Sequence, residues 1–218
     1  MIPAAQWWSI IESYGLQIWP AQIVMYGVAL AIVVGLLLKS GSLFNALTRA
    51  YMALAFAWIG ILFFLVLAKN ITGDTPGHYI FGAAFILVAL VFLLDLFRKS
   101  MDFKLPAAGW QRILTLILLI MVFCYPIVGL TLGRSMGSLI FPGTFPCPTT
   151  ALGLLLLTMA LPRANKLAYI LLLAWAIPFP PAIQIPKYGV YEDSIMLAAG
   201  IFALILLIMN WRQTGKAT

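Results

Sequence analysis

Residues 78–97 read HYIFGAAFILVALVFLLDLF, and in this stretch of 20 residues the only charged side chain is Asp95. A helix needs about 20 apolar residues to cross a lipid bilayer. Lipid offers no hydrogen bonds, so a segment that it surrounds must satisfy its own backbone polar groups, as a helix does. The stretch therefore predicts a transmembrane helix and decides the fold class.

The composition extends this prediction to the whole chain. The 218 residues are 64% hydrophobic and 9% charged, whereas soluble domains carry about 25% charged residues. So few charges could not keep so apolar a surface in water. The net charge of +7 would suggest nucleic acid as the partner of a soluble protein. Here the basic residues lie in short gaps between apolar runs, so we expect the lipid bilayer as partner and no nucleic acid.

Seven apolar runs predict an all-α, polytopic membrane protein with seven transmembrane helices between residues 20 and 211. The runs cover residues 20–38, 46–68, 78–97, 112–132, 148–161, a sixth from 166 that meets prolines at 178–181, and 190–211. Residues 1–19 are expected to form a separate interfacial segment, and residues 212–218 a short tail.

The basic residues predict the orientation of these helices. Alternate gaps and the tail hold ten Lys and Arg on one side of the membrane and three on the other. Cytoplasmic loops carry the excess of Lys and Arg. We therefore expect the N-terminus outside and the C-terminus in the cytoplasm, in a multi-pass protein of the bacterial inner (cytoplasmic) membrane.

The N-terminal segment has the pattern of an amphipathic helix. It contains no Lys or Arg and so lacks the positive region of a signal peptide. Five apolar residues share one helical face: Trp7, Ile10, Ile11, Tyr14 and Ile18. Its tryptophans suit a helix that lies in the headgroup region. The alternative is a disordered end.

Two of the predicted helices are broken. Residues 148–161 would form a helix only about 21 Å long at ~1.5 Å per residue, against a hydrocarbon core of about 30 Å. The preceding run FPGTFPCP, residues 141–148, cannot be regular helix, because proline removes a donor and clashes with the preceding turn. We expect it to enter the membrane from outside, surrounded by protein or water.

The sixth run is interrupted at Pro178-Phe179-Pro180-Pro181. Two helices that break toward the same side predict a shared outer cavity, since interrupted helices mark binding sites in transporters. The candidate ligand-binding residues are Phe145, Pro146, Cys147, Pro148, Thr149, Thr150, Trp175 and Phe179. The competing interpretation is that these prolines only shape loops.

Cys147 begins the fifth helix, where the positive end of the helix dipole favours a thiolate. Thiolates bind soft metals, and the candidate ligands are Cys147, Cys124, His78 and Met136. No two of them show a recognised metal-binding spacing, so no cofactor is assigned. A Cys124–Cys147 disulfide and separately packed thiols are the alternatives.

The acidic residues lie toward the predicted helix ends. Asp193 is expected to cap the last helix, or else to line the outer cavity beside Arg134 and Lys187. Asp95 is expected to pair with a nearby basic residue: Arg98, Lys99 or Arg112. The lack of a carboxylate near a predicted span centre argues against proton-driven antiport.

The run Pro146-Cys147-Pro148-Thr149-Thr150, with Gly153-Leu154-Leu155-Leu156 after it, resembles the signature of a bacterial membrane family known only as a domain of unknown function. Ile18-Trp19-Pro20-Ala21 and Tyr79-Ile80-Phe81-Gly82-Ala83 are similar to its other recurring segments. Gly133-Arg134 departs from the Gly-His of that family, which weakens a metal site. The resemblance implies an inner-membrane, multi-helix protein and no activity.

Three functions remain as hypotheses. The first is transport or binding of a small uncharged, soft or thiol-reactive solute in the outer cavity. The second is a non-catalytic accessory or scaffold subunit, with a membrane-protein partner or as a homo-oligomer. The third is a thiol-redox enzyme that uses the two cysteines. No Ser/His/Asp arrangement or metalloprotease motif is present in the sequence, so an enzyme is not favoured.

Overall fold

The computed structural model describes residues 2–39, 41–72, 76–107 and 109–214, and every element in these ranges is a helix. The elements are α1 (Ala4–Leu38), α2 (Ser42–Trp58), the π-helix η1 (Ile59–Leu67), α3 (Lys69–Thr72), α4 (Gly77–Arg98), α5 (Gly109–Phe123), α6 (Tyr125–Thr131), the 3₁₀-helix η2 (Met136–Ser138), α7 (Pro146–Met159), α8 (Lys166–Ala176), the π-helix η3 (Pro180–Gln184), α9 (Ile185–Tyr188), the 3₁₀-helix η4 (Tyr191–Asp193) and α10 (Ser194–Asn210). The predicted all-α class is confirmed for the described residues. Residues 215–218 of the predicted tail lie outside them.

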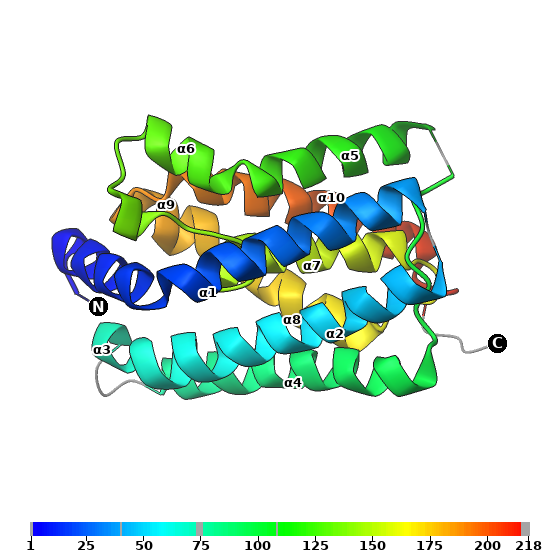
Figure 1. Cartoon of the computed structure of the whole chain (residues 1–218), viewed down its shortest axis with the longest axis horizontal. Coiled ribbons are helices and arrows are strands. Elements are labelled where there is room, and N and C mark those ends of the chain that lie inside the picture. Colours follow the sequence, from blue (N-terminus) through cyan, green and yellow to red (C-terminus); the bar gives the residue numbers. More distant parts are fainter. Residues whose placement is uncertain (1, 40, 73–75, 108, 215–218) are drawn as a thin grey trace.

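Five or six helices could cross a membrane. Five are long and apolar enough: Ala4–Leu38, Ser42–Ile71, Gly77–Arg98, Lys166–Tyr188 and Tyr191–Asn210. A sixth candidate is the pair α5 and α6, which is bent by 56°. The long helices lie side by side along the molecule (Figure 1). Seven complete transmembrane helices are not confirmed, because α7 has only 14 residues.

The short helix α7 occupies the centre of the bundle (Figure 1). All 14 of its residues are buried, and α2, α5, α8 and α10 pack against it. Gly153 leaves room for a side chain of α2, since a Cβ there would lie 2.8 Å from Phe56 Cζ. A helix that is apolar on every side is expected in an interior, so α7 is the core around which the longer helices pack.

The predicted irregular stretch before α7 is confirmed for residues 141–145, which are non-helical and mostly buried. For residues 146–148 the prediction is wrong, because the two prolines there stand in the first turn of α7, where a missing N–H costs no helical hydrogen bond. Side chains supply hydrogen bonds to the backbone of the non-helical stretch. Gln22 Nε2 donates to Leu139 O at 3.0 Å, and Tyr14 OH donates to Thr144 O at 3.2 Å. The Gly143 N–H donates to Thr149 Oγ1 at 2.7 Å. Gly143 has φ +100°, which L side chains rarely adopt.

The N-terminal segment and the first apolar run form one continuous helix. Pro20, at which the first apolar run was predicted to begin, lies inside α1. The amphipathic face is confirmed. Ile11 and Tyr14 are buried, and the other residues of that face are partly covered, whereas the polar face is exposed: Gln6, Ser9, Ser13 and Gln17. The apolar face packs on the rest of the chain.

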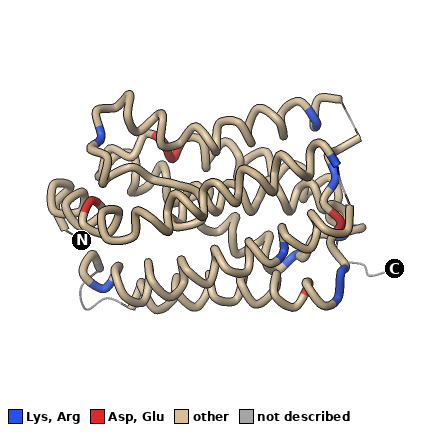
Figure 2. The backbone as a smooth tube through the Cα atoms, viewed as in Figure 1, with Lys and Arg blue, Asp and Glu red and all other residues tan. Residues whose placement is uncertain are grey.

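The basic residues lie mostly at one end of the bundle. Figure 2 shows that Lys and Arg gather where α1 ends and α10 ends, with fewer at the opposite end. The first end is called the basic end below. At this end Arg49 Nε lies 2.7 Å from Asp95 Oδ2, and both side chains are about 5–6% exposed. Asp95 was expected to pair with a basic residue near it in sequence. That expectation is wrong, since α2 packs against α4 and brings Arg49 to it.

Candidate functional site

A cavity of about 260 Å³ lies at the end opposite the basic end. Its walls come from α1, η1, α3, α4, the start of α7, α8, η3, α9 and η4. The lining is mostly apolar, and eight of its residues are aromatic: Trp7, Phe63, Phe64, Phe81, Phe145, Trp175, Phe179 and Tyr188. This space is called the aromatic cavity below. The two broken segments that predicted a shared cavity both contribute residues to it.

Both π-helices contribute side chains to the aromatic cavity. Phe63 and Phe64 come from η1, and Ile183 and Gln184 come from η3. A π-turn is wider than an α-turn, is less stable, and is often found at functional sites. The sequence predicted the break near Pro180 but not the π-helix η1.

Stacked and edge-on rings make one wall of the cavity. The rings of Trp175 and Phe179 stack, with centroids 4.3 Å apart and an interplanar angle of 19°. Phe81 meets Trp175 edge-on at 5.1 Å, and Phe64 meets it edge-on at 5.3 Å. Such contacts fix the orientation of each ring, so the wall is preorganised.

Three polar side chains interrupt the apolar lining: Cys147, Gln184 and Asp193. Gln184 Nε2 donates to Cys147 Sγ at 3.5 Å, whereas Gln184 Oε1 has no hydrogen-bond partner among the described residues. Asp193 is fully buried. The Cys147 thiol and the Tyr125 hydroxyl lie near its carboxyl, but neither contact has hydrogen-bond geometry. Both carboxyl oxygens therefore lack a partner among the described residues.

Asp193 occupies the N-cap position of α10, but its side chain makes no cap hydrogen bond. The expected capping role is therefore wrong. The reason lies in Tyr125, whose hydroxyl accepts the Met196 N–H at 3.1 Å and so satisfies a donor in the first turn of the helix. The Asp193 carboxyl is left to line the cavity, which was the alternative expectation.

Arg134 and Lys187 do not accompany Asp193 in the lining. Arg134 Nε lies 3.3 Å from Glu192 Oε1, and its Cζ lies 3.6 Å from the centroid of the Trp8 ring. The guanidinium is therefore held by the neighbouring carboxylate and by a ring face. Glu192 has a cationic partner, and the adjacent Asp193 has none among the described residues.

The N-terminal segment closes over this region. Trp8 Nε1 donates to Tyr188 O at 2.8 Å. The rings of Trp7 and Tyr188 stack at 4.9 Å with an interplanar angle of 16°. Both of these rings also line the aromatic cavity. Trp7 and Trp8 therefore pack within the chain, whereas Trp19, the third tryptophan of the segment, is 61% exposed.

The predicted ligand-binding residues divide into two groups. Five line the aromatic cavity: Phe145, Pro146, Cys147, Trp175 and Phe179. The other three, Pro148, Thr149 and Thr150, do not. Thr149 instead accepts the Gly143 N–H and donates to Phe145 O at 2.6 Å. Sequence reasoning missed Gln184, although a lone amide within an apolar run was a usable signal.

The four candidate metal ligands are not gathered into a site. Met136 is 75% exposed on η2, while His78 and Cys147 are buried. Both cysteines are free, and Cys124 is only partly covered. Within the described ranges no group of three or more His, Cys, Asp and Glu side chains could hold a metal ion.

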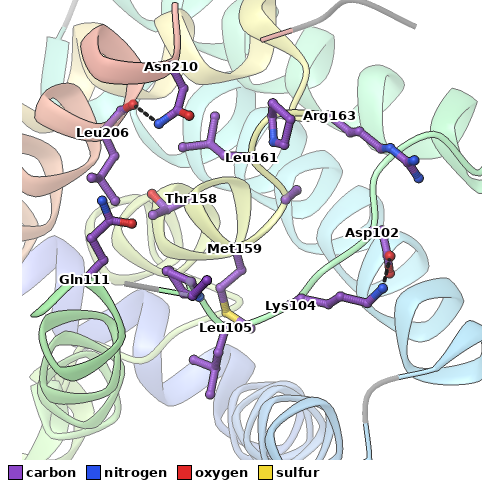
Figure 3. Close-up of a pocket in the computed structure, with 14 residues that line it drawn as sticks. Asp102, Lys104, Leu105, Gln111, Thr158, Met159, Leu161, Arg163, Leu206 and Asn210 are labelled. Carbon is purple, nitrogen blue, oxygen red and sulfur yellow. Dashed lines mark hydrogen bonds and ion pairs between the residues drawn. The ribbon is translucent and has the colours of Figure 1, made fainter. Parts of the chain in front are cut away.

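A second pocket, of about 390 Å³, lies at the basic end (Figure 3). The loop after α4 and the loop after α7 form most of it, and this space is called the loop pocket below. Lys104 Nζ lies 2.6 Å from Asp102 Oδ2, and Asn210 Nδ2 donates to Leu206 O at 2.9 Å. None of the described side chains that line it has a buried nitrogen or oxygen without a hydrogen-bond partner.

Comparison with known proteins places the chain in a family without assigning an activity. No curated protein and no solved structure matches it significantly. A family model matches residues 4–218, which is nearly the whole chain. The resemblance to a family of unknown function is thereby confirmed at the level of the family. The chain belongs to the family of unknown function DUF6064.

Proposed function

We propose that this chain is an inner-membrane protein that binds a small solute in the aromatic cavity and carries it across the bilayer. The observation that carries the proposal is the fully buried Asp193 carboxyl, which lines the cavity with no hydrogen-bond partner among the described residues. A buried polar group without a partner costs about 1–3 kcal/mol. A bound solute would supply the missing partner.

The outer surface of the bundle supports the placement in a membrane. Large apolar side chains are exposed along the long helices, among them Val24, Leu90, Ile120, Ile205 and Ile208. A soluble monomer rarely exposes so much contiguous apolar surface. Lipid is the solvent that suits it.

The proposed topology has seven crossings with the N-terminus outside. α1 begins at one end of the bundle and α10 ends at the other (Figure 1), which requires an odd number of passes. We propose that α7 and the non-helical residues 139–145 together make the fifth crossing. Fourteen helical residues cover about 21 Å, which leaves ~9 Å of a ~30 Å hydrocarbon core for the non-helical residues.

The proposed path runs from outside into the aromatic cavity. The excess of basic residues at the other end supports a cytoplasmic position for that end. The cavity then faces outward, beneath the stacked Trp7 and Tyr188. Displacement of these rings would admit a solute to Cys147 and Asp193.

The accessory-subunit and thiol-redox hypotheses have less support. The first relied on aromatic residues free to dock a partner, but Trp7 and Trp8 pack on Tyr188 and Arg134. The second relied on a cysteine pair, but no disulfide joins the two cysteines. Neither hypothesis accounts for the carboxyl in the cavity.

The test measures whether solutes protect Cys147. In a Cys124→Ser variant Cys147 is the only thiol, and its alkylation by N-ethylmaleimide is followed by intact mass in lipid nanodiscs. We expect at least one class among small amines, alcohols, carboxylates and soft metal ions to slow the reaction severalfold. The matched control is Cys147→Ser, in which the same solute should not slow alkylation of Cys124. If no class protects Cys147, the aromatic cavity is not a solute site.

A further inference from the structure

Resting on the proposed function, we propose that the solute is a small organic ammonium ion, a primary or secondary amine in its charged form with a compact apolar body. The proposal rests on the Asp193 carboxyl, which is fully buried, has no hydrogen-bond partner among the described residues, and lies in a cavity lined by aromatic rings. It replaces the expected uncharged, soft or thiol-reactive solute with a cation.

The first step concerns charge. Asp193 is the only charged residue among those that line the aromatic cavity. The candidate counter-ion Arg134 is held by Glu192 and by the Trp8 ring. An ionised carboxyl in an apolar interior is costly unless a cation pairs with it. A cationic solute would complete a pair that the described part of the protein leaves open.

The second step concerns hydrogen bonds. The amide nitrogen of Gln184 is already used by Cys147 Sγ. The unpartnered polar atoms of Gln184 and Asp193 are oxygens, namely Gln184 Oε1 and both carboxyl oxygens. Oxygens of this kind accept hydrogen bonds, so three of the four unpartnered polar atoms among the described lining residues need a donor, and the fourth, Trp175 Nε1, is itself a donor. An ammonium N–H supplies a donor and a charge together, whereas a quaternary ammonium supplies only the charge.

The third step concerns the walls. Ring faces of Trp, Tyr and Phe attract cations within about 6 Å of the ring centroid. Trp175 and Phe179 present a stacked pair, and Trp7 lies over Tyr188. An inorganic cation would need several oxygen ligands in place of its water shell, and the lining offers few. The aromatic walls suit the apolar body of an organic cation.

The cavity volume limits the size of that body. At about 260 Å³ the cavity is slightly smaller than the usual ligand pocket, which has about 300–1,000 Å³. Simple alkylamines and arylalkylamines are of a suitable size, and benzylammonium is a convenient probe.

The experiment compares two probes of nearly equal shape, benzylammonium and benzyl alcohol. Binding to the full chain in nanodiscs is measured by calorimetry and by tryptophan fluorescence, with empty nanodiscs to subtract partition into lipid. We expect benzylammonium to bind about 10- to 100-fold more tightly, since hydrogen bonds to charged groups are the stronger ones. Asp193→Asn should remove this preference and leave benzyl alcohol binding nearly unchanged.

Two further variants make the result interpretable. Asp102→Asn, in the loop pocket, is the matched control and should leave both affinities unchanged. Trp175→Leu should weaken benzylammonium binding through loss of a ring face, which tests the site without altering the carboxyl. Thermal unfolding of each variant shows whether it is folded.

The outcomes separate the two proposals. If benzyl alcohol binds as tightly as benzylammonium and Asp193→Asn changes neither, the ammonium inference is overturned while the solute site stands. If neither probe binds and no solute class protects Cys147, both proposals fall together. A preference for benzylammonium that survives Asp193→Asn would place the cation elsewhere and would also overturn the inference.

Discussion

The two ends of the bundle contain pockets of opposite character. The loop pocket is the larger, yet none of the described side chains that line it has a buried nitrogen or oxygen without a hydrogen-bond partner. The aromatic cavity is smaller and mostly apolar, yet it contains a buried carboxyl with no partner among the described residues. Buried polar groups in folded proteins are nearly always hydrogen-bonded. The unpartnered carboxyl therefore indicates a binding site more clearly than the volume of a pocket does.

The same contrast holds for the two buried aspartates. Asp95 at the basic end is paired with Arg49 and accepts the Ser100 N–H at 3.0 Å. Asp193 has no comparable support in the described structure. The Asp95 carboxyl holds α2 and α4 together. The Asp193 carboxyl makes no hydrogen bond or ion pair with the described residues. A protein keeps such an unsupported group for function at some cost in stability.

The largest effect on stability is expected when each of the two buried aspartates is replaced by asparagine. Asp95→Asn leaves Arg49 buried without its counter-charge and should destabilise the fold by about 3–5 kcal/mol. Asp193→Asn removes a carboxyl that has no ion pair among the described residues, and it should change stability by less than about 1 kcal/mol. Both are measured by denaturant unfolding in the same detergent. Equal losses in the two variants would show that both carboxyls are structural.

A middle-sized effect is expected from the non-helical stretch of residues 139–145 that precedes α7. Gly143→Ala places a Cβ 2.4 Å from the Tyr51 hydroxyl at a φ of +100°, and it should destabilise the protein by about 1–3 kcal/mol. Gly133→Ala is the matched control, because Gly133 has φ +76° and nothing within 4 Å of the added Cβ. Thermal unfolding of both variants separates crowding from backbone strain. Similar losses would mean that the stretch is not tightly packed.

The smallest effect is expected at the loop pocket, as a dependence on pH. Burial raises the pKa of Asp102, but hydrogen bonds from Lys104 and Asn45 outweigh it and hold the pKa below its ordinary value. The stabilisation is therefore present above the unfolded-state pKa and is lost as the pH falls through the lower folded-state pKa. Because this ion pair is largely exposed, its contribution should be less than about 1 kcal/mol.

Unfolding at pH 5 and at pH 3 checks this expectation. Asp102→Asn should lose slightly less stability on acidification than the natural chain does. An identical loss of stability in the two proteins would show that the ionised Asp102 carboxyl does not stabilise the basic end.

Local pattern was enough to predict most of the helices. The run at residues 78–97 became α4, Gly77–Arg98, because uninterrupted apolar sequence in lipid has little alternative to helix. The prolines of residues 141–148 and 178–181 predicted the irregular stretches, because proline acts on its own backbone and the preceding turn. The N-terminal apolar face was also visible, since a 3.6-residue period is a local property.

The tertiary structure alone decided which residues meet. Cys147 lies 37 positions before Gln184, and it reaches the same cavity as Gln184 and Asp193 through the packing of helices around α7. That Tyr125 takes over the cap of α10, and so frees Asp193, depends on a contact across 71 positions. Sequence determined where the chain is helical, because helices are built from local hydrogen bonds. The site depends on long-range packing, which no local pattern encodes.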